Sequence, residues 1–286
     1  MIPDEPVKET DALMELWFTE KQTPNLGLSC KITRSLHVEQ TDYQHLALVD
    51  TVQYGRMLVL DGMVMTTEVD EFVYHEMITH VALNTHPRPE RVLVVGGGDG
   101  GAIREIIKHD TVKEAVLGEI DRRVVELSQE YLPSIAGSLT DPRVTLAIGD
   151  GVEHVRQNKG KYDVILIDST EPIGPAVGLF SREFYQDVFE ALTPDGIMVA
   201  QSESPFVNQD VIAMIHTNLK EVFPIKHLYL ASIPTYPSGL WSFTIASKKW
   251  DPVQADPGRF RRFDTKYYTP EVHFAAFKLP KFAADW

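Results

Sequence analysis

The sequence predicts an α/β fold in which a small β domain precedes a larger domain built on a mostly parallel sheet. Residues 15 to 68 alternate short strands with turns and carry no helical period. After residue 86, apolar strands alternate with amphipathic helices, the pattern of a parallel sheet covered by helices. An apolar strand also runs directly into a glycine-rich turn at residues 91 to 101, as in open α/β sheets that bind nucleotides.

The chain divides near residue 85, at the proline-containing segment THPRPE. We expect residues 1–14 to be a polar, disordered N-terminus. Residues 15–85 are expected to form the small β domain together with the helix that leaves it. Residues 86–286 are expected to form the larger domain.

The expected elements follow in order along the chain. The strands of the small domain are LWFTE, SCKITRSLHVEQ, YQHLALVD, RMLVLDG and MVMTTE, and its exit helix is DEFVYHEMITHVAL. In the larger domain three segments combine an apolar stripe with a polar face, as helices do: RRVVELSQEYL, SREFYQDVFEAL and QDVIAMIHTNLKEVF. The last two strands, HLYLASIP and LWSFTIAS, flank the turn TYPSG and are expected to pair antiparallel.

The glycine turn VVGGGDGG contains a carboxylate at Asp99. Backbone N–H groups at such a turn usually face a phosphate. Asp99 would repel a phosphate and attract a cation. The turn therefore indicates a positively charged nucleoside rather than a dinucleotide, with tight packing of strand on helix as the alternative use of the glycines.

Acidic residues also end the strands that follow. Glu119 ends AVLGE about twenty residues after the glycine turn, where nucleotide-binding folds place an acid that accepts the ribose hydroxyls. The next two strands end at Asp150, followed by Gly151, and at Asp168. Because parallel strands end at one edge of the sheet, these carboxylates are expected to share one site. Capping of the following helices is the alternative for each of them.

The charge and composition exclude several classes of partner. The 286 residues include 41 acids and 27 bases, which gives a formal charge of -14. This charge argues against nucleic acid and anionic membranes and favours cationic substrates. The sequence shows no transmembrane-length apolar run and no signal-peptide pattern in MIPDEPVKETD, and the single Cys30 fits a reducing compartment. We expect a cytoplasmic protein.

The loop DSTEPIGPAVGLF places Asp168 and Glu171 close together and is stiffened by Pro172 and Pro175. Two such carboxylates suit a metal ion or an amine, but the segment lacks the further ligands that metal sites collect. Three other candidates are Tyr74 and His75 on the exit helix and Tyr236 in a second proline-containing loop, where a packed aromatic ring is the alternative.

The segment HEMITH is not a zinc motif. His75 and His80 are five residues apart, which separates them by about 140° around a helix. No metal is therefore expected at this helix.

Seven segments, in order along the chain, resemble the spermidine synthases of polyamine biosynthesis, especially those of Gram-positive bacteria, and the resemblance spans roughly residue 15 to the C-terminus. These segments are YQHL, LDGMVMTTEVDEFVYHEM, VLVVGGGDGG, GEID, GDG, DSTEPIGP and IPTYPSGLWSF. The resemblance implies a Rossmann-like, methyltransferase-type domain after the small β domain. It also implies transfer of the aminopropyl group of decarboxylated S-adenosylmethionine, a co-substrate, to putrescine, with no metal or redox cofactor, by a homodimer or homotetramer.

The same resemblance implies roles for individual residues. The nucleoside would contact Gln44, Asp99, Glu119, Asp150, Gly151 and Pro175. The amine would contact His75, Asp99, Asp168, Ser169, Thr170, Glu171 and Tyr236. The chemistry would fall to Asp168, Tyr74 and Tyr236, with Asp168 as proton acceptor polarised by tyrosine hydroxyls.

Some alternatives stay open. Many family members have aspartate in place of Glu171, and either Glu171 or Glu203 would anchor the distal ammonium of the amine. The acceptor could also be agmatine or cadaverine. A methyltransferase that uses S-adenosylmethionine and a non-catalytic polyamine-binding protein are the rival functions. Asp99 disfavours the former because it would repel the donor's carboxylate.

Overall fold

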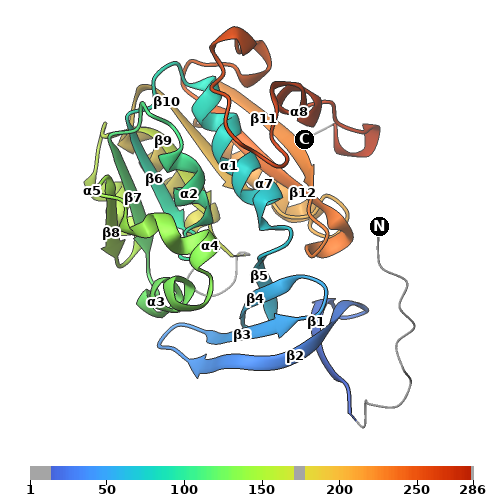
Figure 1. The fold of residues 1–286 in the computed structure, drawn as a ribbon. Coiled ribbons are helices and arrows are strands. Elements are labelled where there is room, and N and C mark those ends of the chain that lie inside the picture. Colours follow the sequence, from blue (N-terminus) through green and yellow to red (C-terminus); the bar gives the residue numbers. More distant parts are fainter. Residues whose placement is uncertain (1–13, 171–177, 285–286) are drawn as a thin grey trace.

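The computed structural model describes residues 14–170 and 178–284, and its chain forms two sheets (Figure 1). The smaller sheet is antiparallel, with strand order β1-β2-β3-β4-β5. Its strands are β1 (Leu16–Thr23), β2 (Leu26–Gln40), β3 (His45–Thr51), β4 (Gly55–Leu60) and β5 (Met63–Thr67). Cys30 lies in β2, within a segment expected to form a strand, and is buried.

The larger sheet has seven strands in the order β11-β12-β10-β9-β6-β7-β8. Five of them run parallel: β6 (Arg91–Gly96), β7 (Glu114–Glu119), β8 (Val144–Ile148), β9 (Tyr162–Asp168) and β10 (Leu192–Gln201). The last two, β11 (Ile225–Ser232) and β12 (Leu240–Ser247), pair antiparallel, as the TYPSG turn predicted. The predicted fold class, a Rossmann-like and mostly parallel sheet after a small β domain, is confirmed.

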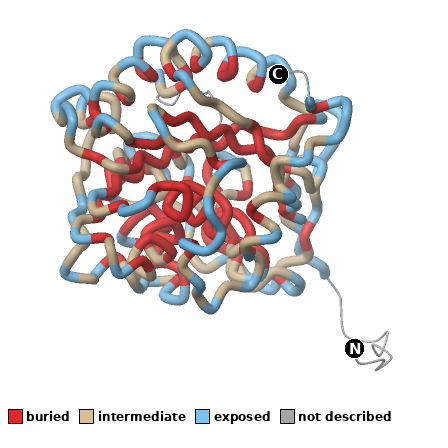
Figure 2. The backbone as a smooth tube through the Cα atoms, turned by 90° about the horizontal axis from the view of Figure 1, so that it is seen from above, coloured by how far each residue is buried: buried red, intermediate tan, exposed pale blue. Residues whose placement is uncertain are grey.

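Helices cover both faces of the larger sheet (Figure 1). They are α1 (Glu71–Thr85), α2 (Gly101–Ile107), α3 (Arg122–Tyr131), α4 (Pro133–Ala136), α5 (Gly151–Gln157), α6 (Arg182–Ala191), α7 (Gln209–Lys220) and α8 (Pro270–Ala276). One face packs against α1 and α2, and the other against α5, α6 and α7. Short 3₁₀ turns cover Gly137–Thr140, Pro237–Gly239, Pro252–Gln254, Pro257–Arg259 and Lys281–Ala283. Figure 2 shows the buried segments gathered in the interior, with the exposed segments around them.

Helix α1 joins the two sheets and is buried almost all round. Its apolar residues pack in the core of the larger sheet, with Met77 and Ile78 fully buried. Buried polar residues follow the same helix, and each must find a partner because an unpaired polar group is costly to bury. Several of them do so around the site described below.

The small sheet is held against the larger part of the molecule by an apolar contact. Leu46, Leu48, Leu58 and Leu60 of β3 and β4 form one cluster with α3 and α4. Asp70, just before α1, also accepts hydrogen bonds from the backbone and the hydroxyl of Thr235. These contacts fix the small sheet across the carboxyl ends of the parallel strands. Within the described residues, no helix has the length and apolar character that a membrane span requires.

Candidate active site

A cavity of ≈ 600 Å³ lies between the small sheet and the carboxyl ends of β6, β7 and β9. It gathers most of the residues predicted from the sequence: Gln44, Tyr74, His75, Asp99, Glu119, Asp150, Gly151, Asp168, Ser169, Thr170 and Tyr236. Glu171 and Pro175 lie outside the described residues. Glu203 is buried, and its backbone N–H donates to the side chain of Gln201, which lines the cavity.

Asp168 is the last residue of β9, and only one of its two carboxylate oxygens has a hydrogen-bond partner among the described residues. The Tyr74 hydroxyl donates to its Oδ1 at 2.6 Å. Its buried Oδ2 has no hydrogen-bond partner among the described residues. Burial, followed by the negative charge of Asp99, raises the pKa of Asp168 to about 6. A buried carboxylate with a free oxygen and a pKa near neutrality is well suited to accept a proton.

The glycine turn lets this carboxylate approach the backbone closely. Gly97 has φ +69°, and a Cβ there would stand 2.5 Å from Asp168 Oδ2. Only glycine tolerates both conditions without strain. At this position the glycine motif therefore serves the contact between the turn and Asp168.

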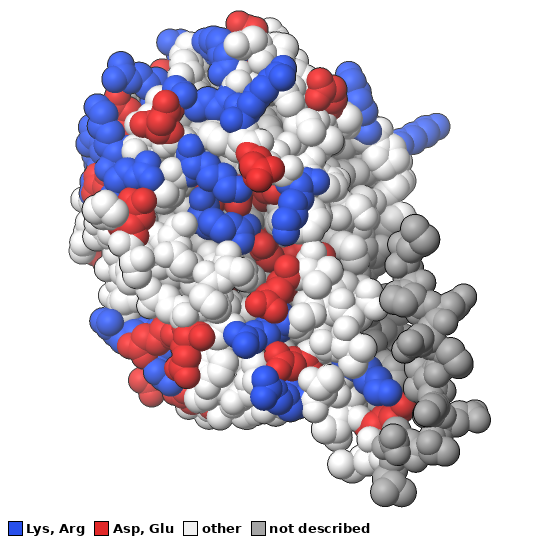
Figure 3. Space-filling view, in the orientation of Figure 1, with Lys and Arg blue, Asp and Glu red and all other residues white. Residues whose placement is uncertain are grey.

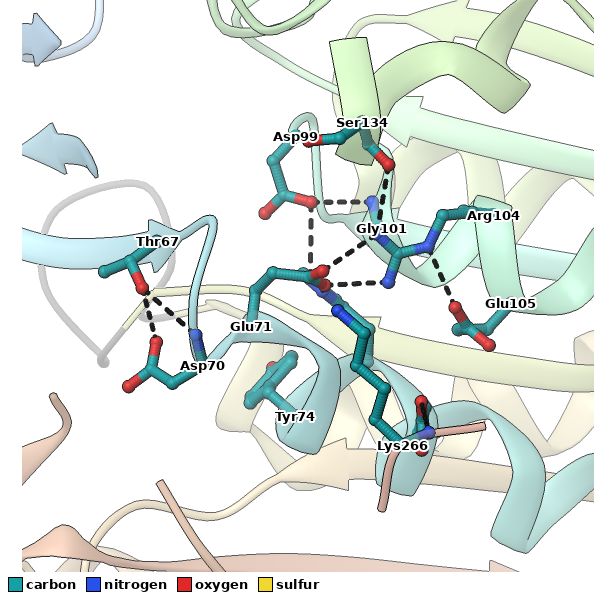
Figure 4. Close-up of polar contacts among 12 residues, drawn as sticks. Thr67, Asp70, Glu71, Tyr74, Asp99, Gly101, Arg104, Glu105, Ser134 and Lys266 are labelled. Carbon is teal, nitrogen blue, oxygen red and sulfur yellow. Dashed lines mark hydrogen bonds and ion pairs between the residues drawn. The ribbon is translucent and has the colours of Figure 1, made fainter. Parts of the chain in front are cut away.

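Asp99 is paired within the protein. Its Oδ1 accepts the Gly101 backbone N–H at 2.7 Å and lies 3.3 Å from His75 Nε2 (Figure 4). Against the opposing effect of burial, the charge of His75 lowers the pKa of Asp99 below its ordinary value. Asp99 is thus an anion at the cavity wall, although part of its charge is balanced by His75.

Glu119 lines the same cavity and is nearly completely buried. Its Oε1 accepts the Asp121 backbone N–H at 2.8 Å. Burial raises the pKa of Glu119 to about 7. Gln44, from the small sheet, donates to Asp121 Oδ2 at 2.9 Å, and Asp121 in turn caps α3. Gln44 therefore ties the small sheet to the strand end that carries Glu119.

Two predicted residues also make contacts within the protein. Asp150 is exposed, lines the cavity and caps α5 by accepting the Val152 backbone N–H at 2.8 Å, as the capping alternative predicted. The Tyr236 hydroxyl donates to the Met65 carbonyl at 2.6 Å, and its ring packs on Tyr74. Of the two tyrosine hydroxyls, that of Tyr74 is the one with a hydrogen bond to Asp168 in the structure.

The two histidines of HEMITH have different surroundings. His75 faces the cavity, whereas His80 is bonded to Glu105 and His109 in the core. Among the described residues, no three His, Cys, Asp or Glu side chains are grouped so that they could hold a metal ion.

Comparison with known proteins identifies the family. Residues 71–256 match the model of the spermine/spermidine synthase domain, and residues 16–68 match that of the spermidine synthase tetramerisation domain. The chain belongs to the spermidine synthase family.

Relatives in this family match nearly the whole chain. The polyamine aminopropyltransferase of Bacillus mycoides is 58% identical over 272 residues, which are 95% of this chain and 99% of the relative. That of Bacillus subtilis is 57% identical over 273 residues, covering 96% and 99%. The resemblance inferred from the seven segments, including that to Gram-positive proteins, is confirmed.

Two solved spermidine synthases share the fold. A crystal structure in complex with the transition-state analogue AdoDATO superposes with a TM-score of 0.91 at 44% identity and covers 93% of each chain. The spermidine synthase of Thermotoga maritima gives a TM-score of 0.88 at 43% identity, covering 93% of this chain and 92% of the other.

This spermidine synthase family member also has site residues that the sequence analysis missed. Glu71 contacts His75, and Arg104 contacts Glu71. Trp241 lines the cavity, and its indole N–H has no hydrogen-bond partner among the described residues. The spacing of Glu71 and His75, four residues apart on a predicted helix, was the available signal. Arg104 had no comparable signal, because its contact with Glu71 joins two different helices.

Proposed function

We propose that this protein transfers the aminopropyl group of decarboxylated S-adenosylmethionine to putrescine and releases spermidine and methylthioadenosine. The observation that carries the proposal is the open Oδ2 of Asp168, in one cavity with Asp99 and Glu119. The names of the relatives, polyamine aminopropyltransferases, support the same activity.

The acceptor must lose a proton before it reacts. The sulfonium of the donor makes the adjacent methylene electrophilic, and a neutral amine nitrogen attacks it. Deprotonating an alkylamine of pKa about 10.4 at pH 7 costs about 4.6 kcal/mol. Asp168 is the proposed proton acceptor. The hydrogen bond from Tyr74 to Oδ1 leaves Oδ2 free to take the proton.

The remaining roles divide between the two substrates. Glu119 is proposed to accept hydrogen bonds from the ribose hydroxyls. Gln44, Asp150, Gly151 and Pro175 are proposed to complete the nucleoside site. Asp99 is proposed to bind the ammonium of the aminopropyl group, which a carboxylate attracts. Binding and orientation of both substrates supply further acceleration. The donor is consumed as a co-substrate, so the proposed reaction needs no cofactor.

Acceptor selection is assigned to the loop that begins with Asp168. His75, Ser169, Thr170 and Tyr236 line the cavity beside Asp168, and Glu171 follows in sequence. The proposed role of Glu171 is to bind the distal ammonium and so to set the preferred chain length. One methylene in a shaped pocket is worth about 1–3 kcal/mol, so putrescine is expected to be preferred over cadaverine by 10-fold or more.

The charge distribution agrees with cationic substrates. Figure 3 shows acidic side chains, with several Lys and Arg beside them, where the small sheet meets the larger part, and more Lys and Arg above that junction. The net charge of -14 adds a long-range attraction for polyamines.

We further propose a homo-oligomer, a dimer or tetramer, because the small sheet matches a tetramerisation domain. We also propose a cytoplasmic location, supported by the single buried cysteine.

A product assay tests the function. The purified protein is incubated with decarboxylated S-adenosylmethionine and putrescine, cadaverine or agmatine, and in parallel with S-adenosylmethionine. We expect equimolar spermidine and methylthioadenosine, with putrescine as the preferred acceptor. A methylated product from S-adenosylmethionine, or no new polyamine with any of the amines, would overturn the proposal.

A further inference from the structure

A line of alternating charges runs from the outer side of α2 to the cavity wall (Figure 4). Arg104 donates from two nitrogens to the two oxygens of Glu71, at 2.9 and 2.8 Å. Glu71 Oε2 lies 2.6 Å from His75 Nδ1, and His75 Nε2 lies 3.3 Å from Asp99 Oδ1. The order is therefore cation, anion, imidazole, anion, and the last group, Asp99, lines the cavity.

Both ring nitrogens of His75 face a carboxylate. A neutral imidazole has one N–H and one lone pair, so one of its nitrogens would present a lone pair to an anion. An imidazolium donates from both nitrogens and satisfies both carboxylates. Burial alone would favour the neutral ring, yet the two anions raise the pKa of His75 well above its ordinary value.

The ring has little freedom to leave this position. A Cβ on Gly101 would overlap the His75 ring, so the first residue of α2 packs directly against the imidazole. Glu71 and His75 are four residues apart on α1, which places their side chains on one face. The bidentate contact with Arg104 fixes the plane of the Glu71 carboxylate.

Charged or titratable side chains lie near His75 on each element packed against it. Glu71 and Tyr74 come from α1, Asp99 from the turn after β6, and Arg104 from α2. Asp168 comes from the end of β9, where burial raises its pKa and the charge of His75 partly opposes that rise. In the view of Figure 4, the Lys266 side chain also points toward Glu71.

We propose that Glu71 is a positioning residue that keeps His75 doubly protonated, with Arg104 as the counter-charge that allows Glu71 to be buried as an anion. The inference deepens the proposed function. A protonated His75 cannot take the proton of the acceptor amine, so Asp168 remains the only one of these two groups able to do so. The protonated His75 also holds the Asp99 carboxylate toward the proposed aminopropyl site.

The protonation of His75 can be measured without any turnover. In the full-length protein labelled with ¹⁵N-histidine, the ring nitrogen shifts are followed against pH. We expect His75 to stay an imidazolium from pH 6 to pH 9 in the native protein. Glu71→Gln removes one of the two anions and is expected to lower the His75 titration midpoint by about 1–3 pH units.

Two further variants keep the test decisive. Glu105→Gln is the matched control, because Glu105 is buried and contacts the same Arg104 but bonds to His80 rather than His75. It should leave the His75 midpoint unchanged. Glu71→Asp retains the charge on a shorter side chain and should lower the midpoint by less than Glu71→Gln, which provides a second reading if Glu71→Gln does not fold.

A His75 ring that is neutral at pH 7 in the native protein would overturn the proposal. Equal midpoints in native protein and Glu71→Gln, or equal falls in Glu71→Gln and Glu105→Gln, would also overturn it.

Kinetics add a separate readout. In Glu71→Gln the alkaline limb of the kcat/KM profile should shift to lower pH by as many pH units as the His75 titration midpoint does. In Glu71→Asp this shift should be smaller. An alkaline limb that stays at its native position while the midpoint falls would overturn the link to catalysis. Failure of the proposed function would instead appear as no aminopropyl transfer by the native protein, whereas the NMR result would still stand.

Discussion

Two carboxylates at the same cavity differ in their readiness to hold a proton. Burial raises the pKa of Asp168, while the charge of His75 keeps that of Asp99 low. Environments that separate two titratable groups in this way assign them different tasks. Asp168 is suited to take up a proton, and Asp99 is suited to remain an anion opposite a bound cation.

The pKa of Asp168 predicts the acid limb of the pH profile. Asp168 must be ionised to accept a proton, so kcat/KM for putrescine should rise with pH and level off above about pH 6. Tyr74 donates to the ionised form and lowers the pKa of Asp168. In Tyr74→Phe the limb should therefore move to higher pH, and a limb that moves to lower pH or stays in place would contradict the assignment.

Glu119 predicts a pH dependence of nucleoside binding. Its pKa in the free protein is raised to about 7, and hydrogen bonds from ribose hydroxyls favour its ionised form. Methylthioadenosine should therefore bind more weakly as the pH falls below 7, by up to about tenfold per pH unit. Calorimetry between pH 5.5 and 8.5 measures this. In Glu119→Gln the affinity should be weak and flat over the range, and a slope retained there would assign the effect to another group.

At the scale of elements, the glycine turn after β6 and residues 168–170 at the end of β9 line one cavity. The glycine turn makes room for the Asp168 carboxylate as well as for a ligand, because Gly97 has a positive φ and lies close to Asp168 Oδ2. A side chain at this position would therefore alter the base as well as the backbone.

We predict that Gly97→Ala lowers turnover far more than it lowers stability. The added Cβ would stand 2.5 Å from Asp168 Oδ2 and displace the carboxylate. Gly160→Ala is the matched control: its φ of +62° imposes a similar backbone strain, but a Cβ there meets nothing within 4 Å. Both variants should lose similar thermal stability, and turnover should fall by 10-fold or more in Gly97→Ala alone. Equal losses of turnover would show that strain rather than contact matters.

The elements with a regular apolar pattern were predictable from the sequence, and those held by long-range contacts were not. The strands that end at Glu119 and Asp168 appear where their patterns placed them. Strand β10 begins with the polar segment LTPDG, and α8 has only seven residues, so neither was predicted. The division near residue 85 remains a proposal, and the packing of α1 on the larger sheet favours a boundary before Glu71.

The site follows the same division. Carboxylates at strand ends could be placed together because parallel strands end at one edge. The sequence could not reveal that Asp99 is already paired with His75, or that the Tyr236 hydroxyl is bonded to Met65. Such contacts depend on the angle between two elements and not on spacing along either one.

At the scale of the whole molecule, the cavity exists because the small sheet is fastened over the strand ends. Asp70 is central to this contact: it is buried and accepts hydrogen bonds from Thr67 and from both donors of Thr235. Thr235 belongs to the loop that also carries Tyr236. The contact therefore joins the small sheet to the wall of the active site.

Asp70→Ala should destabilise the protein by roughly 1.5–3 kcal/mol, because it leaves buried donors without a charged acceptor. Urea unfolding of the full chain measures the change. Asp264→Ala, at an exposed aspartate, should change stability by less than about 0.5 kcal/mol. A loss of stability in Asp70→Ala no larger than in this control would show that the contact does not hold the two parts together.

The central claim, that Asp168 accepts the proton of the acceptor amine in an aminopropyl transfer, is tested most directly by Asp168→Asn. Turnover with decarboxylated S-adenosylmethionine and putrescine is measured beside the calorimetric affinity for methylthioadenosine. Asparagine keeps the size of the side chain but cannot take up the proton, so turnover should fall by roughly 10²–10⁴-fold while the nucleoside affinity stays within a few fold of native. Turnover close to that of the native protein, with the nucleoside still bound, would contradict the claim.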